Sequence, residues 1–152
     1  MLVHLILAEP VITELDGQVS VDLVACEEPK PEIIADVAAG DQCVIVDTNN
    51  PAELPASINE ADVIEIIDHH LLAGGIKTRL PINITIRPLA CTATIMHDLM
   101  GDEDLARAPR GIKGAMLTCI LSDTLEFRSP TTTPHDRAVA EKLPRRATSR
   151  KV

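Results

Sequence analysis

Short apolar runs, separated by polar and proline-containing stretches, mark the first half of the chain. Residues 1–8, 43–46 and 63–67 are almost continuously apolar, as is typical of strands buried on both faces of a parallel sheet. Between 82 and 86, isoleucines alternate with polar residues, which predicts a strand with one wetter face near a sheet edge. Residues 51–58 predict a loop and a helical turn, so the pattern indicates a βαβ unit.

The segments around these strands predict helices and turns. Residues 31–40 predict a short helix that ends at its final glycine, and residues 11–25 predict a hairpin around an Asp-Gly turn. Residues 92–101 predict a helix that Thr92 and Thr94 cap and a glycine ends. Strands therefore alternate with helices.

An apolar stripe with an acidic end follows that helix. Ile112, Met116 and Ile120 recur at every fourth position, and Asp123 comes three residues later on the same helical face. The Asp123 carboxylate is therefore expected to project inward, toward the layer against which the stripe packs. Residues 134–143 predict a last helix.

The composition fits one domain with an aliphatic core. The chain has 152 residues, 45% of them hydrophobic, and Phe127 is its one Phe, Tyr or Trp. The net charge is -9, although the last eleven residues carry five cations, so the remainder is more acidic still. An acidic surface without aromatic stacking platforms disfavours nucleic-acid binding. The expected fold class is α/β, a parallel-stranded open sheet with helices on both faces.

Neither the cysteines nor the opening segment predicts secretion or membrane insertion. The four cysteines are widely spaced without a Cys-x-x-Cys pair, so we expect reduced core residues: Cys26, Cys43, Cys91 and Cys119. The opening apolar run has no basic leader and is too short to span a bilayer. We expect a cytoplasmic protein that does not bind membranes.

Acidic and imidazole side chains follow the buried strands. Asp47 ends one strand, and Asp68, His69 and His70 end the next, which places them at the ligand-binding rim of an open α/β sheet. Each group alone also fits a turn former, a helix cap or a loop. Together with Asp123, however, these carboxylates and imidazoles favour Mn²⁺, Mg²⁺ or Co²⁺ over a thiolate zinc site. Two such ions suit phosphoryl hydrolysis.

Ordered motifs give this site a family resemblance. The chain resembles the DHH phosphoesterase superfamily, and within it the manganese-dependent (family II) inorganic pyrophosphatases, over about residues 40–143. The motifs that carry the resemblance are Asp47-Thr48-Asn49-Asn50, Ile66-Ile67-Asp68-His69-His70, Arg87-Pro88-Leu89-Ala90-Cys91-Thr92-Ala93-Thr94-Ile95, Leu121-Ser122-Asp123-Thr124 and Arg128-Ser129-Pro130-Thr131.

The resemblance implies a role for each site residue. Asp47 would bridge two metal ions, and His69 with Asp123 would complete the second metal site. His70 would contact the bridging phosphate oxygen, and Asp68 would orient the histidines. The implied cofactor is two Mn²⁺ ions, with Mg²⁺ or Co²⁺ as alternatives, and the implied substrate is pyrophosphate. The resemblance also allows a homodimer.

Two departures from the family pattern bear on activity. The family opens with a strand and a His-x-x-x-Asp-x-Asp motif, which nothing before Asp47 matches, and Thr48 stands where many relatives have His. We therefore expect an incomplete DHH catalytic domain over 1–143 and a basic, disordered tail over 144–152. The carboxyl-terminal substrate-clamping domain of the family is expected to be absent.

Two alternatives remain at this stage. A DHH phosphodiesterase acting on short oligonucleotides or cyclic dinucleotides would use the same motifs. A chain with half of a metal site would also serve as an inactive metal-binding or oligomerisation remnant. Outside the motifs, His97 is interpreted as a packed or surface histidine and His135 as a helix-start residue.

Overall fold

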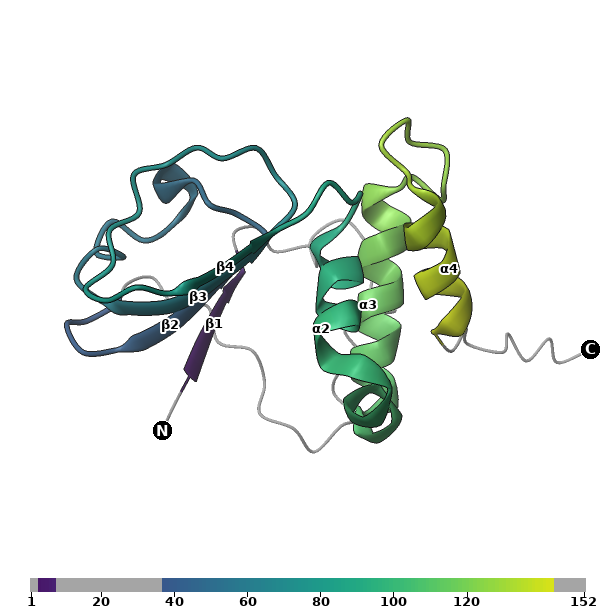
Figure 1. Cartoon of the computed structure of the whole chain (residues 1–152), viewed down its shortest axis with the longest axis horizontal. Coiled ribbons are helices and arrows are strands. Elements are labelled where there is room, and N and C mark those ends of the chain that lie inside the picture. Colours follow the sequence, from purple (N-terminus) through teal and green to yellow (C-terminus); the bar gives the residue numbers. More distant parts are fainter. Residues whose placement is uncertain (1–2, 8–36, 144–152) are drawn as a thin grey trace, which may run out of the picture. The chain divides into compact units, whose positions relative to one another are not determined.

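Two compact units make up the chain, residues 1–88 and 89–152 (Figure 1). The structure, a computed structural model, describes residues 3–7 and 37–143. The first unit contains a sheet and a short 3-10 helix, whereas the second contains three α-helices. Each unit is described by itself.

The sheet is fully parallel in its described part. Its strand order is β1-β2-β3-β4, formed by β1 (Val3–Leu7), β2 (Gln42–Val46), β3 (Asp62–Asp68) and β4 (Asn83–Ile86). The predicted strands, the parallel sheet and the α/β class are thus confirmed. The placement of helices on both sheet faces stays a prediction.

An aliphatic core packs against the sheet. After β2, the helical turn η1 (Pro51–Glu53) begins at Asn50, whose side chain accepts the Ala52 N–H at 3.1 Å. The chain beyond η1 then buries Leu54 and Ile58, as the predicted loop and helical turn require. These residues join one buried cluster, whose members are Val37, Cys43, Ile45, Leu54, Ile58, Ala61, Val63 and Ile66.

The strand β4 lies at one edge of the described sheet. It pairs with β3, with Ile66 opposite Ile84 and Asp68 opposite Ile86. The predicted position near a sheet edge is thus confirmed within the described sheet, and Ile84 is 55% exposed. An edge strand has neighbours on one flank only, so alternation alone does not ensure burial.

In its described residues, 89–143, the second unit contains three helices, namely α2 (Thr92–Arg107), α3 (Arg110–Asp123) and α4 (Pro134–Lys142). Their shared core holds Cys91, Ala93, Met116, Leu117, Ile120, Val139, Ala140 and Leu143. Gly101 has φ 69° and interrupts α2, as predicted, but helical turns resume and continue to Arg107. The left-handed backbone suits glycine and explains the break.

The cap of α2 differs from the prediction. Cys91, rather than Thr92 or Thr94, is the N-cap, and its sulfur accepts the Ala93 N–H at 3.4 Å. The Thr94 hydroxyl instead donates to Asp136 Oδ1 at 2.7 Å. The Thr94 hydroxyl, which local sequence predicts to cap the helix, therefore bonds the distant Asp136 carboxylate.

The helix α4 begins with a reciprocal capping box. Thr133 accepts the Asp136 N–H, while the Asp136 carboxylate accepts the Thr133 N–H at 2.9 Å. His135 lies in the first turn of α4, as predicted. Its Nε2 lies 2.9 Å from Asp98 Oδ1, and His97 is buried in α2, which fits a packed histidine.

Several predictions fall on other parts of the chain. The hairpin over 11–25, nearly all of the helix over 31–40, the tail over 144–152 and Cys26 lie outside the described residues. Cys43 and Cys91 are buried free thiols, and Cys119 is half-buried. None of the described helices is long and apolar enough to cross a membrane.

Candidate metal centre

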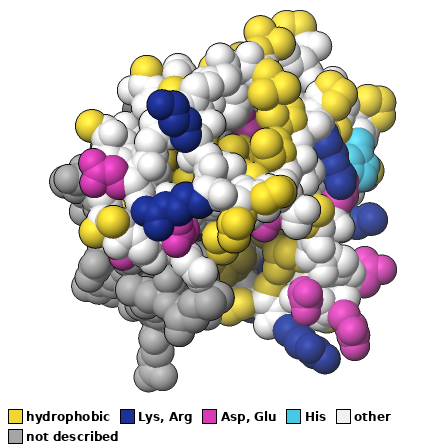
Figure 2. Space-filling view, turned by 60° about the vertical axis from the view of Figure 1, so that its left-hand side comes forward, with side chains coloured by type: hydrophobic (Ala, Val, Ile, Leu, Met, Phe, Trp, Pro, Cys, Tyr) yellow, Lys and Arg dark blue, Asp and Glu magenta, His cyan; other side chains and the backbone are white. Residues whose placement is uncertain are grey.

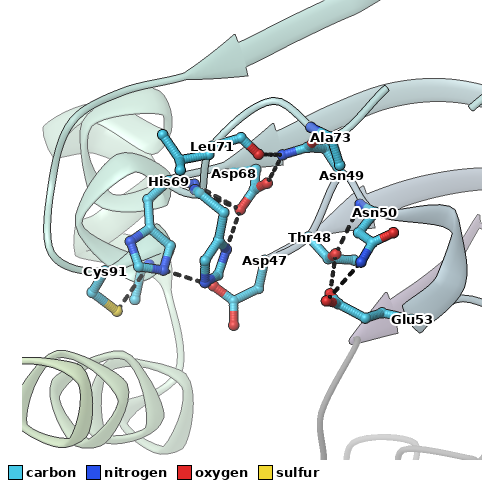
Figure 3. A network of polar contacts seen from close by, with 12 residues as sticks. Asp47, Thr48, Asn49, Asn50, Glu53, Asp68, His69, Leu71, Ala73 and Cys91 are labelled. Atoms are coloured by element: carbon cyan, nitrogen blue, oxygen red, sulfur yellow. Dashed lines mark hydrogen bonds and ion pairs between the residues drawn. The ribbon is translucent and has the colours of Figure 1, made fainter. Parts of the chain in front are cut away.

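The carboxyl ends of β2 and β3 bring the predicted site residues together (Figure 3). Asp47 follows β2 directly, and its backbone N–H donates to Ile67 O at 3.0 Å, which ties it to the end of β3. Asp68 is the last residue of β3, and His69 and His70 follow at once. Parallel strands thus place one aspartate and the Asp-His-His tripeptide at the same sheet edge.

Asp47 adopts an unusual conformation with an unsatisfied oxygen. Its φ is 69°, in the left-handed region that few non-glycine residues occupy. Its Oδ1 is buried without a hydrogen-bond partner within 37–143, and His69 Nε2 lies 3.5 Å away. Backbone strain and an orphaned carboxylate oxygen are together typical of a ligand site rather than of a simple turn.

Three side chains converge in a geometry that suits one divalent ion. One ligand atom each from Asp47, His69 and His70 lies within 4.8 Å of the others. The two imidazole rings are tilted by 52°, with centroids 4.1 Å apart. A carboxylate oxygen beside two ring nitrogens can bind Mn²⁺ as well as other divalent first-row metal ions. The residues present therefore fit the metal that the sequence predicts.

Asp68 lies behind this cluster and is completely buried. Its Oδ2 accepts Asn49 Nδ2 at 2.6 Å, and its Oδ1 accepts the backbone N–H groups of His69 at 2.7 Å and His70 at 3.2 Å. Burial alone raises the pKa of Asp68, but these hydrogen bonds outweigh burial and lower the pKa below its usual value. The carboxylate is therefore ionised.

The ionised Asp68 fixes the tautomer of His70. The His70 Nδ1 lies 2.8 Å from Asp68 Oδ1, and because a carboxylate only accepts, Nδ1 carries a proton. Nε2 is then the nitrogen that the neutral ring offers to a ligand. Burial lowers the pKa of His70, but the hydrogen bond and charge of Asp68 and the charge of Asp47 raise it overall.

Asn49 is a site residue to which the sequence reasoning assigned no role. Its buried carboxamide donates to Asp68 Oδ2 and to Leu71 O, the latter at 2.9 Å, and accepts the Ala73 N–H at 2.6 Å. Its position inside the motif 47–50 was the available signal. The buried Asn49 amide therefore holds Asp68 against the loop that follows β3.

Thr48, which stands where many relatives have His, is buried and faces away from the cluster of ligand atoms. Its hydroxyl donates to Glu53 Oε2 and accepts the Asn50 N–H at 3.1 Å. Hydrogen bonds from Thr48 and Asn50 lower the pKa of Glu53. The hydrogen bonds of Thr48 therefore hold the loop after β2. As a threonine, it cannot provide the imidazole that many relatives have at this position.

Asp123 belongs to the helical unit, where it ends α3. Asp123 is exposed and lies three residues beyond Ile120, the last buried residue of the apolar stripe. Within its unit, Asp123 accepts a hydrogen bond from the Cys91 thiol. Burial raises the pKa of Cys91, and the charge of Asp123 raises it further. The role of Asp123 as a metal ligand stays a prediction.

Named relatives match this chain. A manganese-dependent inorganic pyrophosphatase from Bacillus subtilis is 34% identical over 139 residues, which cover 90% of this chain and 44% of that protein. A protein named as a probable manganese-dependent inorganic pyrophosphatase from Deinococcus radiodurans is 41% identical over 107 residues, which cover 70% of this chain and 33% of that protein. The chain thus spans less than half the length of either relative.

A solved structure and a family description agree with these matches. A Methanococcus jannaschii protein, whose crystal structure was assigned to the family II inorganic pyrophosphatases, matches with a TM-score of 0.66 and 32% identity. The match covers 76% of this chain and 39% of that protein. The N-terminal domain of the DHH family matches residues 3–123, which include the strand-end aspartates and the Asp-His-His tripeptide. This chain therefore belongs to the DHH family.

Proposed function

We propose that the chain supplies the amino-terminal part of a manganese-dependent inorganic pyrophosphatase, which hydrolyses pyrophosphate to two phosphates. The observation that carries the proposal is the convergence of ligand atoms from Asp47, His69 and His70 within 4.8 Å, backed by the buried Asp68. The names of the matched relatives support the same substrate and metal.

Each residue has a distinct task in the proposed reaction. Asp47 and His69 would hold Mn²⁺, with Asp123 as a further ligand, and two ions are proposed for the complete centre. When bound, Mn²⁺ activates water and neutralises phosphoryl charge. His70 keeps a proton on Nδ1 against Asp68 and turns Nε2 toward the substrate side. From there Nε2 would contact a phosphate oxygen of the substrate.

The acidic character of the chain supports a small substrate over a nucleic acid. A net charge of -9 repels an extended phosphate backbone, whereas a metal ion neutralises a small diphosphate locally. The same charge argues against an anionic membrane surface as a partner. We also propose a cytoplasmic location, which the buried free thiols of Cys43 and Cys91 support.

Two measurements on the whole 152-residue chain test this function. Calorimetric titration should show Mn²⁺ binding that Asp47→Asn abolishes, and in a phosphate-release assay any Mn²⁺-dependent release from pyrophosphate should be lost in the same variant. Hydrolysis of a cyclic dinucleotide without action on pyrophosphate would favour the phosphodiesterase alternative. Wild-type protein that binds no Mn²⁺ would overturn the proposal and favour a remnant.

A homodimer through the β4 edge is proposed as the assembly state. Within the described sheet β4 pairs with β3 alone, and Ile84, Leu72 and Leu80 leave much of their apolar surface exposed. Figure 2 shows exposed hydrophobic side chains on the face of the molecule that it presents. Two β4 edges would pair antiparallel across a twofold axis.

Light scattering tests the assembly state. The wild-type chain should show twice the 16.4 kDa mass, and Ile84→Lys should return it to one chain. A wild-type mass of one chain at all concentrations would contradict the homodimer.

A further inference from the structure

We propose that Asn49 is a positioning residue of the metal centre, whose carboxamide holds the Asp68 carboxylate in the orientation that presents His70 Nε2 to the metal and substrate. The inference rests on the proposed function, because it takes the Asp47 cluster to be a metal site. Asn49 is not one of the proposed metal ligands, and its hydrogen bonds explain why an asparagine occupies this position.

The orientation of the Asn49 amide is fixed independently of Asp68. Its Nδ2 donates to a backbone carbonyl, Leu71 O at 2.9 Å, and its Oδ1 accepts a backbone N–H, Ala73 N at 2.6 Å. Neither backbone group can exchange its role, so the amide cannot flip. The second Nδ2 hydrogen is then directed at Asp68 Oδ2, 2.6 Å away. The side chain is only 4% exposed, so water does not compete freely for these bonds.

The two oxygens of Asp68 consequently have separate partners. Asn49 binds Oδ2, whereas Oδ1 receives the backbone N–H groups of His69 and His70 and the His70 ring Nδ1. Without the Asn49 donor, Oδ2 would be buried and unsatisfied, which favours rotation of the carboxylate. Rotation moves Oδ1 away from His70 Nδ1.

Rotation of the Asp68 carboxylate would affect metal binding through the tautomer of His70. While Nδ1–H donates to Asp68 Oδ1, Nε2 carries the lone pair that a ligand needs. If that hydrogen bond weakens, the neutral ring is free to carry its proton on Nε2, and this tautomer cannot bind a cation through Nε2. Asn49 thus acts on the metal centre through two hydrogen bonds in series.

The chemistry of the site accounts for asparagine at this position. The side chain at this position must donate two hydrogen bonds and accept one. It must also be short enough to reach both Asp68 and the loop after β3. Aspartate offers no donor and would place an oxygen where Nδ2 now lies 2.6 Å from Asp68 Oδ2. Alanine removes all three hydrogen bonds.

The neighbouring Asn59 provides a matched control. Its exposed side chain also anchors the loop after β3, because its Oδ1 accepts the Lys77 N–H at 2.8 Å. Both asparagines therefore bond a backbone N–H of this loop, but of the two only Asn49 bonds Asp68. Asn59→Ala removes loop anchoring without touching Asp68.

The experiment compares the full wild-type chain with Asn49→Ala, Asn49→Asp and Asn59→Ala. Nitrogen NMR of the metal-free proteins reports the His70 tautomer, and calorimetry with Mn²⁺ alone reports affinity. We expect the wild type and Asn59→Ala to show the Nδ1–H tautomer and equal affinity. Both Asn49 variants should shift toward Nε2–H and bind Mn²⁺ about tenfold more weakly or worse, as loss of a supporting hydrogen bond typically causes.

Each outcome decides a separate question. Asn49 variants with wild-type tautomer and affinity would overturn the positioning role, as would an equal loss in Asn59→Ala. A wild type that binds no Mn²⁺ refutes the proposed function, while the metal-free tautomer still tests Asn49. If Asn49→Ala fails to fold, Asn49→Asp decides, because it retains the size and the acceptor for Ala73.

Discussion

One oxygen of Asp68 fixes both the backbone and the ring of His70. Oδ1 lies 2.8 Å from the ring Nδ1 and accepts the backbone N–H of the same residue at 3.2 Å. A histidine held at two points cannot rotate its ring without losing a charge-assisted hydrogen bond. His70 is therefore ordered before any ligand arrives.

Replacing Asp68 with asparagine should destabilise the chain. The partners of Asp68 are all donors, whereas an asparagine offers only one acceptor oxygen, so a buried donor loses its partner. Such a loss costs about 1–3 kcal/mol. Urea unfolding of metal-free Asp68→Asn should show this decrease in the free energy of unfolding.

Asp62→Asn is the control for that substitution. Asp62 begins the same strand and pairs with Arg79 at 3.2 Å, but both side chains are partly exposed, so the change should be below about 1 kcal/mol. Equal midpoints for Asp68→Asn and the wild type would contradict the prediction.

Replacing Asp47 with glycine should raise the stability of the metal-free chain and abolish metal binding. At φ 69°, glycine removes the steric cost that a Cβ imposes, roughly 1 kcal/mol, and the substitution also removes an orphaned oxygen. Metal-free Asp47→Gly should therefore melt at a higher temperature than the wild type, yet bind no Mn²⁺.

Asp47→Ala separates the two effects. It also lacks the carboxylate but keeps the Cβ, so calorimetry should find no Mn²⁺ binding, and its melting temperature should lie below that of Asp47→Gly. If glycine lowers the melting temperature relative to alanine, the backbone at 47 is not strained.

Asp136 should give the chain an acid-sensitive stability. Burial raises its pKa, but hydrogen bonds from Thr133, Thr94 and the Ala90 N–H lower it below the usual value. The unfolded state then binds more protons in acid. The contribution of Asp136 is complete above the unfolded pKa, roughly 4, and is lost as pH falls through the native pKa.

Denaturant unfolding between roughly pH 3 and pH 7 measures this effect. Asp136→Asn should be less stable than the wild type near neutrality, because an amide cannot accept all of these hydrogen bonds. The gap between the two should narrow as the pH falls. A gap that stays constant over the range would show that Asp136 does not titrate below its unfolded value.

The glycine pair at 74 and 75 permits a controlled test of the loop after β3. Both residues have positive φ, so alanine at either position costs about 1 kcal/mol. At Gly75 a Cβ would also lie 3.1 Å from Pro51 Cγ, whereas at Gly74 it meets open space. Gly75→Ala should therefore lower the melting temperature more than Gly74→Ala; equal losses would show that the loop yields at Pro51.

The cysteines should differ in reactivity. Burial and the Asp123 charge raise the pKa of Cys91, so little thiolate forms at neutral pH, whereas Cys119 is only half buried. Iodoacetamide labelling followed by peptide mass mapping should find Cys119 modified well before Cys91. In denaturant the two rates should become equal, and faster labelling of native Cys91 would contradict its burial.

The sheet and the metal cluster could be predicted because their signals are local and repeated. Apolar runs specify strands, and parallel strands end at one edge whatever connects them. The sequence alone therefore predicted that Asp47 would meet Asp68, His69 and His70. The cap of α2 could not be predicted, because the Thr94 hydroxyl, which local sequence favours as a cap, bonds Asp136, 42 residues away.

The remaining differences also have physical causes. Ile84 is exposed although it alternates with polar residues, because β4 lies at an edge of the described sheet. The hydrogen bonds of Asn49 could not be predicted, since its partners are backbone groups and a buried carboxylate that only the folded loop brings near. Asp123 follows the helical period of α3, but the helix ends at that residue.

The bonds of Asp136 also set an order of events in folding. Its carboxylate holds Thr94 and Ala90 across sequence separations of 42 and 46 residues, so the start of α2 completes its bonding only after α4 has docked. Contacts of this span form more slowly than a helix does. During synthesis, the helical unit is therefore expected to close only once residue 136 has left the ribosome, with α4 docking as its last step.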